Sequence, residues 1–193
     1  MIYNDPIEIK RKTVIKASMF IGGKQKGKVS KKTILFSKAI GRRVRYNSQY
    51  SDRYTGAGSL NLVDGLTGSI AHNDNYWQGW IEKDMDIVID LSKQEKISKV
   101  SIGFLESHKS WIFLPTRVEL SFSDDDRTYR NQEEIKIADG ARGGTANRVE
   151  SESKDLNLSA RYVRIRAINR KTCPEWHSGS GGQAWIFSDE IVV

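Results

Sequence analysis

Short stretches in which apolar and polar residues alternate recur along the chain. The alternation is clearest in RVELSFS at 117–123 and in RYVRIR at 161–166. Successive side chains of a strand point to opposite faces, so each stretch can bury one face and leave the other in water. Similar β-branched and aromatic runs, separated by Gly, Asn, Asp and Ser, predict strands at 13–20, 32–36, 85–91, 97–104, 116–123, 161–168 and 185–193.

No long stretch has the 3.6-residue apolar period of a helix. Many short strands without intervening helices predict an all-β fold, an antiparallel β-sandwich rather than a parallel sheet with crossover helices. The connections between strands are long and carry special residues, and rigid scaffolds often carry their binding residues on such loops. The most notable loops are the aromatic and polar 47–61 and 71–80, the short 106–111, the glycine-rich 139–147 and 171–183.

Length and composition bound the possibilities further. A chain of 193 residues fits one full domain and a fragment of another. The single cysteine, Cys173, cannot form an internal disulfide and so indicates no particular redox compartment. No apolar run approaches the roughly 20 residues of a membrane helix, so we expect no membrane insertion. The first residues do not resemble a signal peptide, and any export signal is expected to lie outside this sequence.

The net charge of +7 is unevenly distributed along the chain. Residues 1–46 hold 13 Lys and Arg against two Asp and Glu, whereas the rest of the chain is weakly acidic. A basic segment can indicate nucleic-acid binding. Here the basic residues are interleaved with Val, Ile and Phe at strand spacing, which favours the solvated face of a strand. We therefore expect no nucleic-acid partner.

Six short motifs occur along the chain in this order: LVDG at 62–65, YW at 76–77, IVIDL at 87–91, VELSFSDD at 118–125, ARYVRI at 160–165 and SDEI at 188–191. Together they resemble the coagulation factor 5/8 type C (discoidin) domain, which implies a galactose-binding-domain-like jelly roll over residues 46–193. Through 58–65, 110–115 and 173–177, the closest resemblance is to family 32 carbohydrate-binding modules of bacterial family 20 β-hexosaminidases. One departure is Asp-Met-Asp at 84–86, where many relatives have an aromatic residue.

Residues 1–43 resemble a different module. DPIEI at 5–9 and TVIKA at 13–17, followed by a Gly-Gly pair and another strand, are similar to the last strands of the small β-sandwich of chitobiases. A fragment of about 40 residues cannot build its own core. We expect this segment to be poorly ordered or to lie as a ribbon against the main domain.

The resemblance also implies one structural Ca²⁺ ion. Asp64 and Glu190 match the family's carboxylate positions, and carbonyl or side-chain oxygens of Asn61, Thr67 and Ser69 are candidates to complete the shell. Calcium takes six to eight oxygen ligands, which such a mixture can supply. The alternative is that Asp64 caps a turn and Glu190 is a surface charge.

The family's ligand sits on loops at one end of the sandwich, and here three loops supply aromatic and polar residues. A sugar presents apolar faces and a rim of hydroxyl groups, so its site needs an aromatic platform beside polar groups. Trp111 is equally consistent with a core position, whereas Trp176 is expected to be exposed, and Trp77 and Trp185 to pack inside. The candidate ligand-binding residues are Tyr50, Arg53, Tyr54, Glu106, His108, Trp111, Trp176 and His177.

Chemistry beyond binding is not expected. Most acidic residues lie in turns such as 124–126, where nothing would raise the pKa of a glycosidase acid. Cys173, His108 and His177 lack the spacing of a zinc site, and SGSGG at 178–182 only superficially resembles a phosphate-binding loop because no Lys-Ser/Thr follows it.

The sequence thus predicts a non-catalytic module of a secreted bacterial glycosidase, a β-hexosaminidase or chitobiase. Such a module would bind GlcNAc- or galactose-containing glycans outside the cell, in the periplasm or at the cell surface, beside the catalytic domain of the same parent chain. The alternatives are a discoidin-type adhesion domain and a spacer that packs on the catalytic domain.

Overall fold

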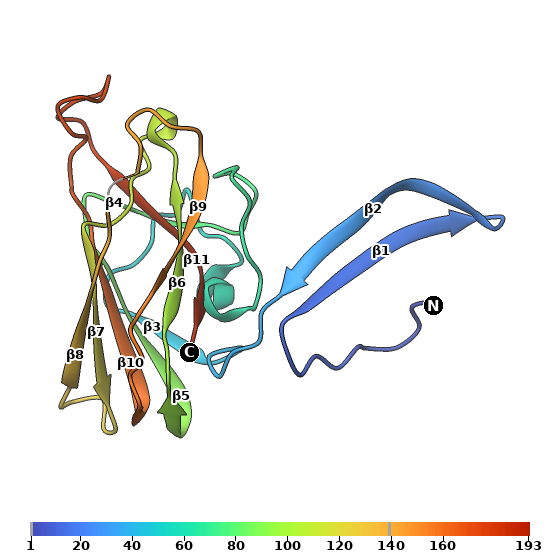
Figure 1. The fold of residues 1–193 in the computed structure, drawn as a ribbon, viewed down its shortest axis with the longest axis horizontal. Coiled ribbons are helices and arrows are strands. Elements are labelled where there is room, and N and C mark those ends of the chain that lie inside the picture. The colour runs from blue at the N-terminus through green and yellow to red at the C-terminus, as the bar shows by residue number, and fades with distance from the viewer. Residues whose placement is uncertain (1, 139) are drawn as a thin grey trace.

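The chain forms two stacked antiparallel sheets, from which a two-stranded ribbon projects (Figure 1). The computed structural model describes residues 2–138 and 140–193, the side chains at 131 and 132 aside. One sheet has five strands in the order β3-β5-β10-β7-β8, and the other has four in the order β4-β11-β6-β9. The five-stranded sheet comprises β3 (Arg43–Tyr46), β5 (Met85–Ile97), β7 (Arg117–Ser123), β8 (Arg130–Lys136) and β10 (Leu158–Ile168). The four-stranded sheet comprises β4 (Gln78–Ile81), β6 (Ser101–Glu106), β9 (Asn147–Glu152) and β11 (Trp185–Val192).

The predicted alternation places one face of each sheet in a shared core. In β7 the buried residues include Val118, Leu120 and Phe122, and in β10 they include Val163 and Ile165. Apolar residues of β6 and β11 meet them from the opposite sheet. The all-β sandwich predicted from the sequence is therefore confirmed. A second apolar cluster, of Trp77, Leu105, Ile112, Trp185 and Phe187, confirms that Trp77 and Trp185 are packing residues.

The outer face of the five-stranded sheet is covered by ion pairs across strands. The central strand β10 presents Arg161 to Asp90 and Arg164 to Asp86, each through two hydrogen bonds of 2.7–3.0 Å. Burial raises the pKa of Asp86, but hydrogen bonds from Arg164 and Asn47 outweigh it, and the pKa lies below its usual value. The polar half of the alternation thus forms a charge-paired surface.

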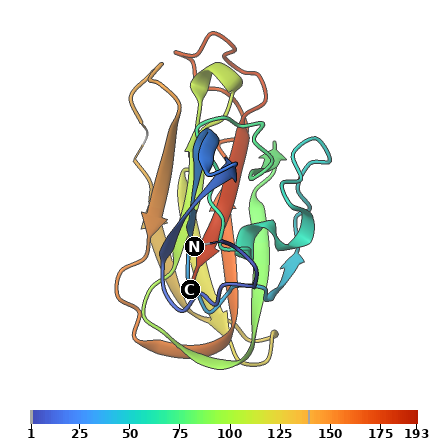
Figure 2. The same ribbon diagram turned by 90° about the vertical axis from the view of Figure 1, so that its right-hand side faces the viewer.

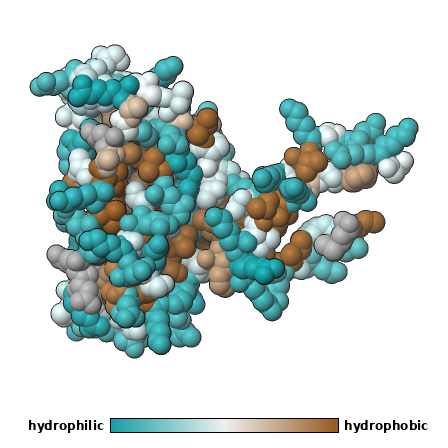
Figure 3. Space-filling view, in the orientation of Figure 1, coloured by the Kyte–Doolittle hydropathy of each residue, from teal (hydrophilic) through white to brown (hydrophobic). Residues whose placement is uncertain are grey.

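The N-terminal part of the chain forms the ribbon, which we define as β1 (Thr13–Ile21) and β2 (Lys24–Ile34). Figure 1 shows it standing away from the sandwich, joined to it at the C-terminal end of β2. Apolar side chains are exposed along it (Figure 3), among them Met19, Phe20 and Ile21 at its tip. The expectation was poor order or a ribbon lying against the main domain, whereas this ribbon projects away from the sandwich.

Strand prediction failed where strands are short or mostly polar. β3 and β4 have four residues each, and β8 and β9 read RNQEEIK and NRVESE. β8 and β9 are edge strands of their sheets, where charged residues are common. The predicted strand 97–104 is in fact divided, because β5 continues to Ile97 and β6 begins at Ser101. Two short 3₁₀ helices, η1 (Gly58–Val63) and η2 (His108–Ser110), interrupt the loops.

Candidate functional site

Three loops meet at one end of the sandwich, which we call the loop end. They are the loop around η2, the loop that precedes β9 and the loop between β10 and β11, and Figures 1 and 2 both place them together at the top. The η2 loop is closed by reciprocal backbone hydrogen bonds between Ser107 and Ile112. At its tip Trp111 has a φ of 62°, a left-handed conformation that is rare for a bulky residue.

Glu106 and His108 tie two of these loops together. The backbone N–H of Gly143 donates to Nδ1 of His108 at 3.2 Å, so Nδ1 carries no proton and Nε2 donates to the Glu106 carboxylate at 3.0 Å. The same carboxylate oxygen accepts the N–H of Gly140 at 3.2 Å. A side chain at Gly140 would collide with Glu106, its Cβ lying 1.9 Å from Oε2. Of this loop, Asp139 lies outside the described residues.

His177 is held in the same way. Its Nδ1 accepts the N–H of Gly179 at 3.0 Å, and its Nε2 donates to the His108 carbonyl at 2.8 Å. Both nitrogens of both histidines are therefore used within the loops. His108 and His177 were predicted to bind ligand directly. Both rings are buried and hydrogen-bonded through both nitrogens, and of the two only His108 is among the residues that line the hollow at the loop end.

A hollow of about 160 Å³ lies at the loop end. It is lined by His108, Phe113, Gly140, Arg142, Arg170 and Trp176. Trp176 forms one wall, standing edge-on to His108 with ring centroids 4.9 Å apart, and it packs on an apolar cluster that includes Phe113. The guanidinium of Arg142 lies 5.9 Å from the Trp176 ring, and that of Arg170 lies 5.1 Å from the Phe113 ring. Trp176, expected to be exposed, is half-buried. The hollow thus combines aromatic walls with the guanidinium groups of Arg142 and Arg170.

The Trp111 ring packs against Gly179 and Gly182 and stands edge-on to His177, with ring centroids 5.9 Å apart. Its side chain is 40% exposed, so it is not a core residue. A Cβ on Gly179 or on Gly182 would lie 2.4 Å from the indole, so neither position can carry a side chain without moving the ring. The glycine-rich stretch 178–182 therefore packs against an aromatic ring. Its resemblance to a phosphate loop has no structural basis.

Tyr50, Arg53 and Tyr54 do not join the other candidates. Tyr50 packs edge-on against Tyr46 and Trp80 near the main core. Arg53 and Tyr54 line a separate hollow of about 120 Å³, with His72, Asn73 and Asn75 among the other residues. The cause is backbone pairing: the 47–57 loop runs along β4, with hydrogen bonds from Ser51 to Gly79 and from Gly79 to Tyr54. The single three-loop cleft expected from the sequence is thus two hollows.

Arg142, Phe113 and Arg170 were missed as site residues. Arg142 lies in a glycine-rich loop and has no aromatic residue beside it in the sequence, so it did not fit the pattern of a sugar site. Its position in a glycine-rich loop before a strand could have indicated it. Phe113 follows the apolar Ile112 and Arg170 follows a strand, so nothing in their sequence neighbourhood indicates a site, and only the fold brings them together.

A second polar cluster lies where the 64–69 loop meets β11. Glu190 is 1% exposed, and its Oε2 accepts the N–H of Gly65 at 3.0 Å. Its other oxygen, Oε1, has no hydrogen-bond partner among the described residues. Burial, and then the nearby carboxylate of Asp64, raise the pKa of Glu190 to about 9. The alternative reading of Glu190 as a surface charge is excluded by its burial.

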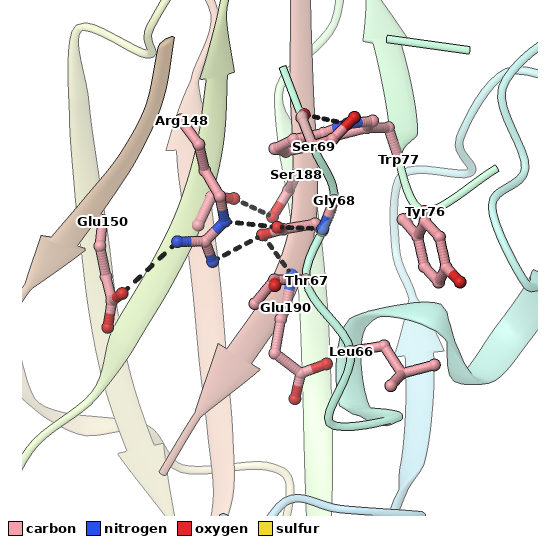
Figure 4. Close-up of polar contacts among 12 residues, drawn as sticks. Leu66, Thr67, Gly68, Ser69, Tyr76, Trp77, Arg148, Glu150, Ser188 and Glu190 are labelled. Atoms are coloured by element: carbon pink, nitrogen blue, oxygen red, sulfur yellow. Dashed lines mark hydrogen bonds and ion pairs between the residues drawn. The ribbon is translucent and has the colours of Figure 1, made fainter. Parts of the chain in front are cut away.

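The neighbouring Asp189 anchors the same loop by a buried ion pair (Figure 4). Its carboxylate receives Nε of Arg148 at 2.6 Å and the N–H of Gly68 at 2.8 Å. Burial raises the pKa of Asp189, and the hydrogen bonds from Arg148 act against that rise. In Figure 4 the side chain of Glu190 points away from Arg148, toward Leu66. Asp189 thus has a cationic partner, whereas Glu190 accepts a hydrogen bond from the backbone N–H of Gly65.

The remaining predicted calcium ligands differ in what they offer. The Asn61 amide is occupied, since its oxygen accepts the N–H of Ala57 and its nitrogen donates to the carbonyls of Tyr76 and Asp189. The Ser69 carbonyl accepts Nε1 of Trp77 at 3.1 Å. The Thr67 carbonyl accepts Nζ of Lys32 at 2.8 Å.

The cluster offers oxygens of the kinds that calcium ions take as ligands. Among the described residues, no group of three or more His, Cys, Asp and Glu side chains is placed to hold a metal ion. Calcium does not require three such side chains, because backbone carbonyls serve equally as ligands. The unpaired Oε1 of Glu190, the half-buried carboxylate of Asp64 and the Thr67 carbonyl are oxygens of the required type. The side chain of Asn61 does not belong to this set.

Comparison with known proteins agrees with the fold. The sequence model of the F5/8 type C domain family matches residues 43–186. A Streptococcus pneumoniae fucose binding module has a TM-score of 0.52 and 14% identity, over 81% of this chain and 92% of that chain. A second fucose binding module from that organism, SpX-3, has a TM-score of 0.49 and 18% identity, over 81% of this chain and 96% of that chain. A Clostridium perfringens module solved with glcNAc-alpha-1,4-galactose has a TM-score of 0.46 and 14% identity, over 81% of this chain and 91% of that chain. A search of the curated proteins found no match.

No helix among the described residues is long and apolar enough to cross a membrane.

Proposed function

The chain belongs to the F5/8 type C domain family, and on that premise we propose that it is a non-catalytic carbohydrate-binding module. The glycan would bind in the hollow at the loop end, with Trp176 as its platform. The observation that supports this most directly is the placement of two guanidinium groups beside the aromatic rings, Arg142 by Trp176 and Arg170 by Phe113. Aromatic faces complement the C–H faces of a sugar, and charged groups complement its hydroxyls.

The ligand class that we propose is a glycan containing GlcNAc or galactose. The fold is shared with a fucose binding module of Streptococcus pneumoniae, so fucosylated glycans belong in the same test. Trp111 would extend the site, because its 40% exposed ring stands edge-on to His177, which in turn contacts Trp176, and its left-handed backbone is held by the loop. Strained conformations of this kind persist where the surroundings enforce them, often at binding sites.

We further propose that the module serves a secreted glycoside hydrolase, a β-hexosaminidase, and acts outside the cell. The similarity of 58–65, 110–115 and 173–177 to modules of such enzymes supports this. Weak binding by a tethered module is sufficient there, because it raises the effective concentration of substrate at the catalytic domain.

A glycan array tests the proposed site. Wild type should bind a subset of GlcNAc-, galactose- or fucose-containing glycans, and Trp176→Ala and Arg142→Ala should lose that binding. Arg53→Ala is the matched control, because it removes an exposed arginine from the separate hollow and should leave binding unchanged. Loss of binding only in Arg53→Ala would move the site to the other hollow. No binding by wild type would favour an adhesion domain or a spacer.

We also propose that Asp64, Glu190 and the Thr67 carbonyl hold a structural Ca²⁺ ion. A divalent cation would supply the partner that Oε1 of Glu190 lacks and would relieve the repulsion between the two carboxylates. Its role would be to stabilise the 64–69 loop against β11.

A further inference from the structure

A lysine from the ribbon reaches into the proposed cation site. Nζ of Lys32, near the C-terminal end of β2, donates to the Thr67 carbonyl at 2.8 Å. The same ammonium lies 3.4 Å from the centroid of the Tyr76 ring, a cation–π contact. Its charge also acts on the nearby Asp64. Lys32 therefore supplies a positive charge to the loop that is expected to hold a cation.

The backbone next to Lys32 is attached to the same loop. Ile34 forms an antiparallel bridge with Leu66, and the N–H of Leu35 donates to the Gly65 carbonyl at 2.8 Å. This contact extends the pairing from the ribbon into the 64–69 loop. The position of the ribbon and the conformation of the loop are consequently coupled through a few adjacent residues.

The oxygen that Lys32 uses is one that a divalent ion would need. The Thr67 carbonyl, the Asp64 carboxylate and the unpaired, buried Oε1 of Glu190 are the candidate ligands of the site. A monovalent ammonium and a divalent ion repel one another strongly at a few ångströms in a partly buried site. Coordination of the ion by the Thr67 carbonyl would place it within a few ångströms of the ammonium of Lys32, and the repulsion between the two charges disfavours binding of both at once.

We infer that Lys32 competes with the divalent cation for the Thr67 carbonyl, so that cation binding and docking of the ribbon oppose each other. Without the cation, Lys32 pins the end of the ribbon to the 64–69 loop. Binding of the cation displaces the ammonium and loosens the ribbon. Linkage requires the effect to be reciprocal, so an undocked ribbon increases affinity for the cation by the same factor. This inference rests on the proposed cation site and is independent of the glycan site.

Calcium titration of the full chain by calorimetry tests the competition. Lys32→Met should bind Ca²⁺ about tenfold more tightly than wild type, within the usual range of coupling between sites. Lys31→Met is the matched control, because Lys31 is exposed on the same strand and its substitution removes the same charge. Glu190→Gln should abolish binding in either background. Equal affinities in wild type and the two lysine variants would overturn the competition, and no calcium binding by any of them would overturn the cation site as well.

Hydrogen exchange provides a second readout that does not depend on affinity. Saturating calcium should increase amide exchange at 32–36 in wild type, because the pairing of Ile34 and Leu35 with the loop weakens. In Lys32→Met the calcium-dependent change should be much smaller. Unchanged or reduced exchange at 32–36 on calcium binding by wild type would contradict the inference. Glycan binding, measured on the same proteins, separates these outcomes from a failure of the proposed function.

Discussion

Arg148 and Asp189 form a bidentate ion pair in which the carboxylate is fully buried. Nε donates to Oδ2 at 2.6 Å and the second guanidinium nitrogen to Oδ1 at 3.1 Å, while the Asp189 side chain is 0% exposed. The carboxylate also receives backbone N–H groups of Gly68 and Glu190. One buried charge thus joins β9, β11 and the 64–69 loop.

Replacing Arg148 by Met should therefore destabilise the fold by about 3 kcal/mol, because it leaves a buried charge without its partner. Urea denaturation measures the change. Glu150→Gln is the control, since Glu150 contacts the same guanidinium at 3.4 Å but is itself exposed, and a loss below about 1 kcal/mol is expected. Equal losses in the two variants would show that the burial of Asp189 does not matter.

A side chain at Gly179 should disturb the site without touching a ligand. In Gly179→Ala the new methyl group would overlap the Trp111 ring, and the forced shift should cost about 1–3 kcal/mol. Denaturation measures the cost, and a shift in tryptophan emission should accompany it. Ser180→Ala changes the adjacent exposed residue and should alter stability by less than about 0.5 kcal/mol. A Gly179→Ala protein as stable as wild type would mean that the ring moves freely.

Asp125 should make stability depend on acid in a defined window. Hydrogen bonds from the N–H groups of Thr128 and Arg127 lower its pKa from 3.8 to about 2. Because the pKa of this carboxyl is lower in the folded state, its ionised form stabilises the fold at pH values above the unfolded-state pKa. That contribution is lost as the pH falls through the folded-state pKa. The difference in melting temperature between wild type and Asp125→Asn should therefore be constant above pH 5 or so and shrink between about 4 and 2. A difference that stays constant down to the lowest pH would contradict this.

Calcium should raise the melting temperature of wild type, and a chelator should lower it again. A ligand that binds only the folded state adds about 2.7 kcal/mol at a concentration 100-fold above its Kd. Asp64→Asn should respond much less, because it removes one of the two carboxylates. A melting temperature insensitive to calcium and chelator would count against the cation site.

The sequence predicted the sandwich well because burial on one face of a strand imposes a strict two-residue period, as in Val118, Leu120 and Phe122. It predicted β8 and β9 poorly because edge strands need little apolar surface. The motif order identified the family from local residues alone. Local motifs do not indicate which loops lie next to one another in the folded chain.

Grouping of site residues failed where long-range backbone pairing decides the outcome. Arg53 and Tyr54 were assigned to the loop end, but pairing with β4 holds their loop elsewhere. Lys32 gave no signal at all, because its contact with Thr67 crosses 35 residues and two structural units. His108 and His177 were correctly placed at the loop end, yet their ring nitrogens serve the loops, which only hydrogen-bond geometry reveals.

The packing of Trp111 on Gly179 and Gly182 leaves its ring exposed and makes this residue an intrinsic fluorescence probe. Trp77, Trp80 and Trp185 are at most 9% exposed and Trp176 is half-buried, whereas Trp111 is 40% exposed. A soluble quencher such as acrylamide should therefore reach Trp111 first. Occupancy of the loop end can be followed by loss of quenching in the unlabelled protein, with Trp111→Phe as the blank.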